Sequence, residues 1–159
     1  MSAAAARLNH YATKMIVKSD LLGSLEVEET DIFHFPTGLF GFPDSRDFVL
    51  LPVESSGLYW LQSTDHSALA FLLVDPFLHF NGYSVDIGSG DLKELDAGES
   101  SAVAILSIVT LPRTRDEKPT ANLQGPVAFN FKGRRARQLA LQHSGFDVRC
   151  AFDLEPVDS

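Results

Sequence analysis

Cysteine is nearly absent from this 159-residue chain, which carries a single one, Cys150. One cysteine cannot form an intrachain disulfide, and this favours a protein of the reducing cytoplasm. Cys150 lies in an alternating segment with Phe146, Val148 and Phe152 on its face, which predicts a buried small hydrophobe and not a nucleophile.

Long apolar runs are absent too, since no stretch approaches the ~18 residues that a membrane helix needs. We therefore expect a cytoplasmic protein that does not use a membrane.

Basic side chains are scarce in the first two thirds of the chain. Residues 19–101 hold 15 acidic and 2 basic side chains, a net charge of −13, whereas residues 102–159 carry +2 and the whole chain carries −8. A surface this acidic repels phosphate backbones and attracts basic partners. The charge thus predicts no direct binding of nucleic acid and favours a basic protein partner, such as an RNA-binding protein. A role in solubility alone is the alternative.

Patterns that carry chemistry are also scarce. The five histidines are scattered, without the spacing of a metal-binding motif. Asp65-His66-Ser67 has the letters of a catalytic triad, but neighbouring residues cannot adopt its geometry, because triad members come from separated segments. We expect no catalytic residue, no metal and no cofactor. A small β-barrel hydrolase or isomerase using Asp65, His66 or Asp75 is the enzymatic alternative.

Most of the chain alternates apolar and polar residues with period two, and turn signals recur about every ten residues. This pattern predicts an all-β protein, a single compact antiparallel β-barrel-like domain. The expected strands are Gly23–Thr30, Asp31–Phe35, Phe48–Val53, Leu58–Gln62, Leu69–Val74, Tyr83–Ile87, Ala102–Leu111, Val127–Phe131 and Phe146–Leu154.

One or two short helices are expected beside the strands. Gly90–Leu95 could form one helical turn. Arg134–His143 places apolar residues at helical offsets, and Gly145 follows where a C-cap would stand. We divide the chain into a flexible N-terminal tail at residues 1–14, the β domain at 15–154 and a C-terminal tail at 155–159.

Residues Phe35–Phe42 combine a proline and two glycines with four large apolar side chains. Proline fixes φ and glycine opens positive φ, so the backbone must turn here. A solvated loop has little use for Phe35, Leu39, Phe40 and Phe42 together. The segment therefore predicts a packed corner between two strands.

Two polar turns are candidates for contact with a partner. Asp75 precedes Pro76 after a buried strand, so its side chain either caps the turn or meets a partner. Asn122-Leu123-Gln124 lies before Gly-Pro in a turn between strands. Leu123 is either tucked into the core or displayed, and a displayed leucine flanked by two amides would suit recognition of a protein backbone.

The segment Lys132–Arg137 is strongly basic for an otherwise acidic chain. It lacks the glycine-rich loop of a P-loop, and positive charges at a helix N-terminus oppose the macrodipole. We expect a solvated helix face. A small β-barrel RNA-binding module that uses Lys132–Arg137 is the alternative function.

Four segments in order and spacing resemble the flagellar assembly factor family FliW. They are Phe35–Phe42, Trp60–Ser63, Phe71–Pro76 and Thr120–Asn130, and the likeness covers about residues 15–153. The resemblance implies a cytoplasmic bacterial protein without catalysis and with a β-barrel-like fold. It also implies two partners: CsrA, a small dimeric RNA-binding repressor of translation that the family antagonises, and flagellin. By binding both partners, such a protein would couple flagellin synthesis to flagellin secretion.

The acidic surface suggests how such a repressor would be captured. A basic RNA-binding dimer would be drawn to the acidic region by long-range attraction, and the same field would then oppose RNA phosphates. We expect the protein to act as a monomer. The expected contact residues are Glu26, Glu28, Glu29, Asp31, Asp75, Asn122, Leu123 and Gln124.

Overall fold

The computed structural model describes residues 14–53, 57–98, 102–142 and 145–154. The expected tails lie outside these ranges, except for Lys14, which begins the first strand. The strands are β1 (Lys14–Ser19), β2 (Gly23–Glu28), β3 (Ile32–His34), β4 (Asp47–Pro52), β5 (Leu58–Ser63), β6 (Ala70–Val74), β7 (Val103–Thr110), β8 (Thr120–Ala121), β9 (Val127–Asn130), β10 (Arg135–Gln138) and β11 (Cys150–Ala151). Short helical elements join them: η1 (Glu29–Asp31, 3₁₀), α2 (Pro76–His79) and α3 (Ser89–Glu94).

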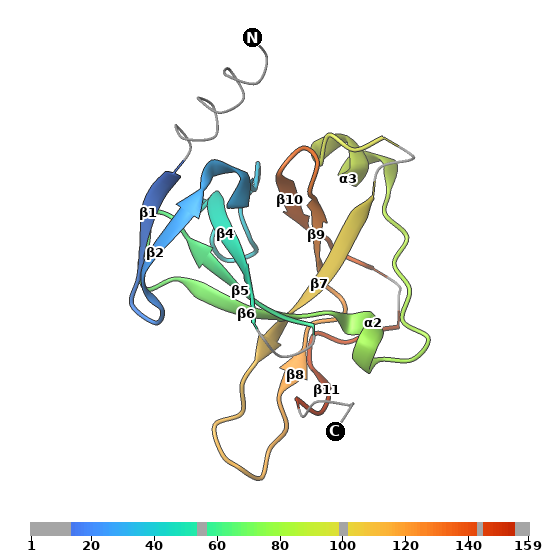
Figure 1. Ribbon diagram of the computed structural model, residues 1–159. Helices are drawn as coiled ribbons and strands as arrows, with labels where there is room; N and C mark the ends of the chain where they lie inside the picture. The colour runs from blue at the N-terminus through green and yellow to red at the C-terminus, as the bar shows by residue number, and fades with distance from the viewer. Residues whose placement is uncertain (1–13, 54–56, 99–101, 143–144, 155–159) are drawn as a thin grey trace.

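Seven of the strands close into a barrel. Neighbours pair in the order β7-β6-β5-β4-β3-β10-β9, and β9 pairs back onto β7 through Val103–Leu106 (Figure 1). Closure leaves these strands no free edge to pair with another chain. Each pairing is antiparallel except that of β10 with β3, which is parallel and short. The expected all-β, barrel-like class is confirmed.

Phenylalanine fills the inside of the barrel. Phe33, Phe35, Phe48 and Phe129 are at most 3% exposed, and their rings meet edge to face at centroid distances of 5.1–6.1 Å. Such pairs add stability beyond the burial of their area, without a polar group to satisfy. A second apolar cluster lies around Tyr83, Leu95, Leu123 and Phe152.

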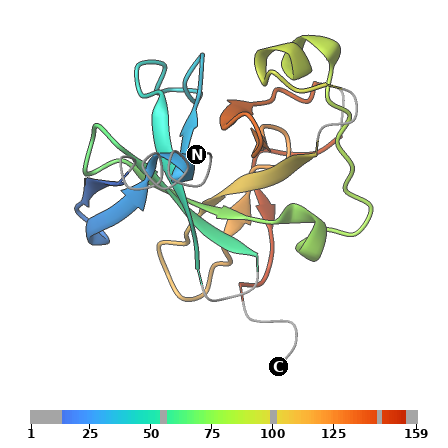
Figure 2. The ribbon, with the colours of Figure 1, turned by 45° about the horizontal axis from the view of Figure 1, so that its top comes forward.

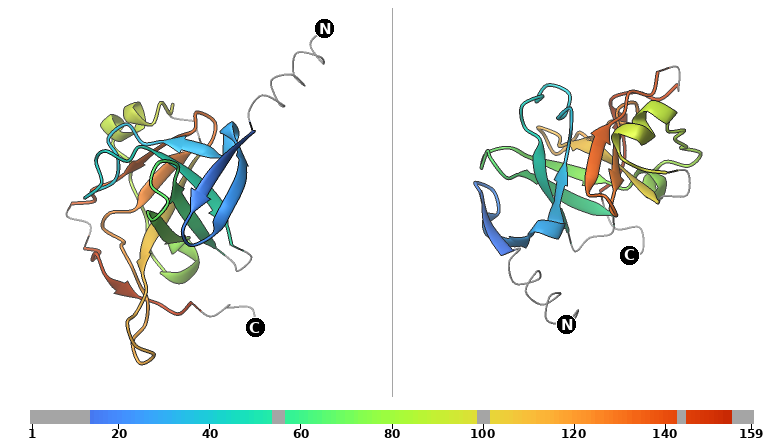
Figure 3. Two further views of the ribbon diagram at one scale, coloured as in Figure 1. Left: turned by 90° about the vertical axis from the view of Figure 1, so that its left-hand side faces the viewer. Right: turned by 90° about the horizontal axis from the view of Figure 1, so that it is seen from above.

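The hairpin β1–β2 forms a separate two-stranded sheet on the outside of the barrel (Figure 3). Val17 and Val27 pack with Val49 of β4, and all three are almost fully buried. Cross-strand partners in an antiparallel pair share a face, so Ile16 and Glu26 stand together on the solvent side. The hairpin therefore carries part of the acidic surface outward.

The helix expected at Arg134–His143 is wrong, because residues 135–138 form strand β10. Arg134 adopts a left-handed φ of 54°, which ends any helical path at the start of the segment. The Asn130 Oδ1 atom accepts hydrogen bonds from the backbone of Lys132 and Gly133 and so closes the hairpin β9–β10. Burial then alternates along Arg135–Gln138, as a strand requires.

Two expected strands are also wrong or too long. Tyr83–Ile87 alternates in burial but has no strand pairing, and it runs as extended chain toward α3. The strand expected at Phe146–Leu154 is reduced to Cys150–Ala151. Cys150 is partly buried, but Val148 is 52% exposed and does not share its environment. The expected turn at Gly90–Leu95 is confirmed as α3.

Candidate functional site

The four expected acidic contacts lie together at the end of β2 and in η1. Glu26 and Glu29 are exposed. Glu28 and Asp31 form a capping box around η1, in which the Glu28 backbone N–H donates to Asp31 Oδ2 at 2.9 Å. Glu26 and Glu29 are therefore the members of this group that have no part in the capping box.

Basic side chains stand close to one end of the acidic group. Glu29 lines a shallow hollow of about 260 Å³ together with His34, Arg134 and Arg135. The Lys132–Arg135 part of the basic segment is exposed at the tip of the β9–β10 hairpin and not on a helix. The solvated helix face expected for Lys132–Arg137 is therefore wrong, because residues 135–138 form strand β10.

Asp75 serves the local fold. Its carboxylate accepts a hydrogen bond from the Phe77 backbone N–H at 2.9 Å, which makes it the N-cap of α2. Pro76 occupies the first turn, where a missing N–H is harmless. The capping interpretation of Asp75 is the one that the geometry supports.

The turn after β8 keeps one of its expected contact residues inside. Leu123 is 2% exposed and belongs to the second core cluster. The interpretation of Leu123 as an exposed contact residue is therefore wrong. Asn122 Oδ1 accepts hydrogen bonds from the backbone of Gln124 and Gly125 and shapes the turn. Gln124 is exposed at its tip.

The corner at Phe35–Phe42 is only half buried. Phe35 and Leu39 lie in the core, whereas Phe40 is 58% and Phe42 is 41% exposed. The expectation that all four side chains are buried is wrong for these two. Leu39 and Phe42 exchange backbone hydrogen bonds in a tight turn. The rings of Phe40 and Phe42 lie largely outside the core. Phe42 packs edge to face on Phe71, whereas the Phe40 ring makes no ring contact with another residue that the structure describes.

Phe40 forms one wall of an apolar hollow of about 270 Å³, which we call the Phe40 groove. Val148, 52% exposed, and partly buried Leu141 add apolar surface. Amide side chains complete it. The lining residues are Phe40, Asn122, Gln124, Gly125, Ala140, Leu141, Gln142 and Val148. The groove thus gathers three segments that are distant in sequence.

One buried side chain holds two of these segments together. Gln138 Oε1 accepts from the Phe40 backbone N–H at 2.9 Å, and Gln138 Nε2 donates to the Gly125 carbonyl at 2.9 Å. Gln138 is 6% exposed. The corner and the 122–125 turn are therefore fixed to one another through strand β10.

A second hollow, of about 540 Å³, borders the groove and is polar. Both hollows are lined by Ala140, Leu141 and Gln142, and the second also includes Asp86 and Asp91. Arg137 binds Asp91 at 2.6 Å and Glu94 at 3.0 Å. Arg137 also donates to Thr37 Oγ1 at 3.2 Å, so it ties α3 to the corner.

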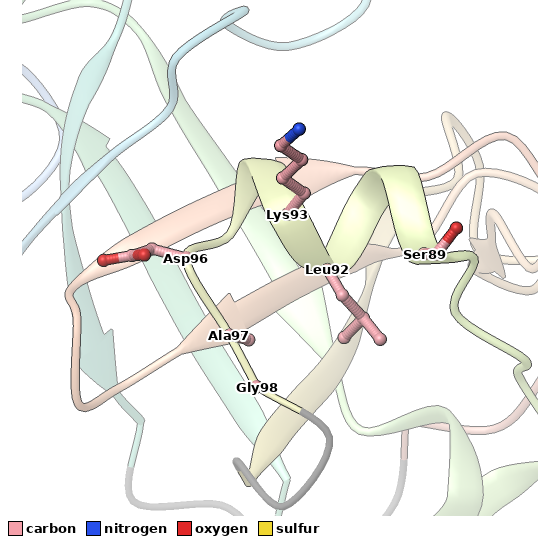
Figure 4. A pocket seen from close by; sticks show the side chains of 6 residues that line it. All are labelled: Ser89, Leu92, Lys93, Asp96, Ala97 and Gly98. Carbon is pink, nitrogen blue, oxygen red and sulfur yellow. The ribbon is translucent and has the colours of Figure 1, made fainter.

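The described residues that line the hollow over α3 do not form an arrangement suited to catalysis. Lys93 and Asp96 point in different directions, and Leu92 turns away from both (Figure 4). The remaining lining residues are small. Within the part of the chain that the structure describes, no three His, Cys, Asp or Glu side chains gather as a metal site would need.

Across the described ranges, no helix is long and apolar enough to cross a bilayer.

Among the described residues, Tyr83 is the group whose pKa the fold clearly shifts. Burial raises the pKa of its phenol to about 12, and its hydroxyl donates to the Leu123 carbonyl at 2.8 Å. A phenol held neutral and hydrogen-bonded in this way supports the 122–125 turn from below the surface.

Comparison with known proteins identifies the class to which this architecture belongs. The family model described as "FliW protein" matches residues 16–152, so the chain belongs to the FliW family. A protein of Pseudothermotoga lettingae named flagellar assembly factor FliW is 36% identical over 85% of this chain and 86% of its own length. One of Natranaerobius thermophilus with the same name is 37% identical over 85% and 90%.

A solved structure agrees with the sequence matches. The crystal structure of a flagellar assembly factor FliW superposes with a TM-score of 0.79 at 31% identity, and covers 86% of this chain and 96% of that one. The family resemblance noted in the sequence is thereby confirmed. The groove residues Phe40, Gln142 and Val148, and the buried Gln138 that holds the corner, were not expected as a site, because they come from segments whose pairing only the fold reveals.

Proposed function

We propose that this protein is a non-enzymatic, cytoplasmic flagellar assembly factor that works by occupying other proteins. It captures a CsrA-type RNA-binding repressor of translation and also binds flagellin. When secretion removes flagellin, the free protein takes up the repressor, and flagellin synthesis resumes. The match to the FliW family over residues 16–152 is the observation that carries this proposal.

The charge distribution supports the capture of a basic partner. The −13 net charge of residues 19–101 creates a field that raises the rate of encounter with a basic RNA-binding dimer. Glu26 and Glu29 are exposed and belong to this region. After binding, the same field opposes RNA phosphates near the complex, so RNA is excluded by charge as well as by volume.

Direct binding measurements test the proposal. Purified protein is titrated by calorimetry with the CsrA-type repressor and with flagellin of the same organism, and a gel shift with RNA alone is run in parallel. We expect both proteins to bind, no shift of RNA, and release of RNA from the repressor when the protein is added. Binding of neither protein would overturn the proposal, and a direct RNA shift would favour the Lys132–Arg137 alternative.

A matched pair of charge reversals tests the electrostatic step. Glu26→Lys with Glu29→Lys alters the acidic group, and Asp116→Lys with Glu117→Lys makes the same change of net charge on the exposed β7–β8 loop. We expect the first pair to slow association with the repressor by about tenfold or more, with a small effect on release. Equal association rates for the two pairs would exclude the β2–η1 group as the docking region.

Salt provides a second readout of the same step. Raising the salt from about 50 to about 500 mM shortens the Debye length from above ~10 Å to below ~8 Å, and so screens exposed charges. The affinity for the repressor should fall over this range. An unchanged Kd would contradict the electrostatic capture, even though the chain belongs to the FliW family.

A further inference from the structure

An exposed aromatic ring is held in a fixed place at the Phe40 groove. Phe40 is 58% exposed, although its backbone N–H is bound by the buried Gln138. Apolar surface that a partner covers on binding contributes favourably to the free energy of binding. Because the corner is already anchored, little conformational entropy would be lost when a partner packs on the ring.

The rim of the groove carries unused hydrogen-bonding groups. The side chains of Gln124 and Gln142 are exposed, and neither makes a side-chain hydrogen bond to the residues that the structure describes. An amide offers both a donor and an acceptor. A peptide backbone running over the groove could pair with these amides while a side chain fills the space between Phe40 and Val148.

The neighbouring hollow sets the charge of the occupant. Asp91 is neutralised by Arg137, but Asp86 is exposed and has no ion-pair partner among the described residues. Asp147 and Arg149 flank Val148 and carry opposite charges. The apolar groove is therefore bordered by uncompensated negative charge.

The geometry points to a docking site for one kind of occupant: a segment of a protein partner with an apolar side chain in the Phe40 groove and a nearby lysine or arginine beside Asp86. This site is separate from the β2–η1 acidic group and contains no residue of it. The inference rests on the proposed function only in that the protein acts by binding other proteins. Charge complementarity across the two hollows is the argument for a basic segment.

Selection from a phage-displayed library of random dodecapeptides on the full chain tests this site. We expect enriched peptides that pair Leu, Ile, Met or Phe with Lys or Arg. Their affinity should fall at least about tenfold for Phe40→Ser and for Asp86→Lys. The control is Phe77→Ser, since Phe77 on α2 is 48% exposed and lies outside the groove. It should retain the affinity of the unaltered chain.

The outcomes separate this site from the proposed function. Enriched peptides that bind Phe40→Ser and Asp86→Lys as tightly as the unaltered chain, or no enrichment at all, would overturn the docking site. The repressor and flagellin are then titrated against the same variants. Loss of either on Phe40→Ser identifies the occupant, whereas peptide binding without binding of either protein would leave the site in place and refute the proposed function.

Discussion

Replacing Gln138 by leucine should loosen the Phe40 groove and destabilise the fold. The Gly125 carbonyl, which is buried, would lose the amide that donates to it, at a cost of about 1–3 kcal/mol. The Phe40 N–H is partly buried and can turn toward water, at a cost of about 0.5–1.5 kcal/mol. Leucine preserves most of the volume, so no large cavity adds to these terms. We expect the free energy of unfolding to fall by about 1.5–4.5 kcal/mol.

Urea denaturation of the Gln138→Leu variant measures this loss. The control is Gln142→Leu, which makes the same change at an exposed position of the same groove and should alter stability by less than about 0.5 kcal/mol. A domain of ordinary stability, about 5–15 kcal/mol, remains folded after the loss. If Gln138→Leu were as stable as its control, the two hydrogen bonds would not be what joins the corner to the 122–125 turn.

Three further changes have defined outcomes. Gly38→Ala should lower the free energy of unfolding by at least about 3 kcal/mol, because Gly38 has a φ of +70° and a Cβ would lie 2.6 Å from a carbonyl oxygen. The control Gly41→Ala, at a positive φ with open space around it, should lower it by only about 1 kcal/mol. Urea denaturation measures both. Asp75→Ala removes the N-cap of α2 and should lower the free energy of unfolding by about 1 kcal/mol, with both partner affinities unchanged. A loss of affinity would instead show that Asp75 contacts a partner. The phenol of Tyr83 is neutral in the fold up to about pH 12, so stability should fall as pH rises from 10 toward 12, and Tyr83→Phe should flatten that part of the profile.

Strands that lie in the barrel wall could be predicted closely because one of their faces is buried throughout. β4, β5, β6 and β7 differ from the expected ranges by about one residue at each end. β10 could not be predicted, because Arg135–Gln138 offers both helical and alternating spacing. The deciding features are the left-handed Arg134 and the Asn130 turn, which become visible only in the hairpin.

The candidate site was less predictable than the fold for a physical reason. Sequence patterns report which side chains are apolar, but not which apolar side chain remains uncovered after packing. Phe35 and Phe40 are alike in the sequence, and the first is fully buried while the second is 58% exposed. The amides Asn122 and Gln124 were expected near a partner surface, and both line the Phe40 groove.

The structure also limits the direction from which a basic partner can be drawn. Arg134 and Arg135 lie beside Glu29 in one hollow, so the attraction near η1 is weakened by two positive charges. Glu26 stands on the outward face of β2, across from Ile16 on β1, on the hairpin that lies outside the barrel. The hairpin β1–β2 and α3, whose Asp91 lines the hollow beside the Phe40 groove, lie on opposite sides of the molecule (Figure 2). A basic partner steered by Glu26 would therefore meet a different face from a segment that docks in the Phe40 groove, and two partners could be bound without competing for one surface.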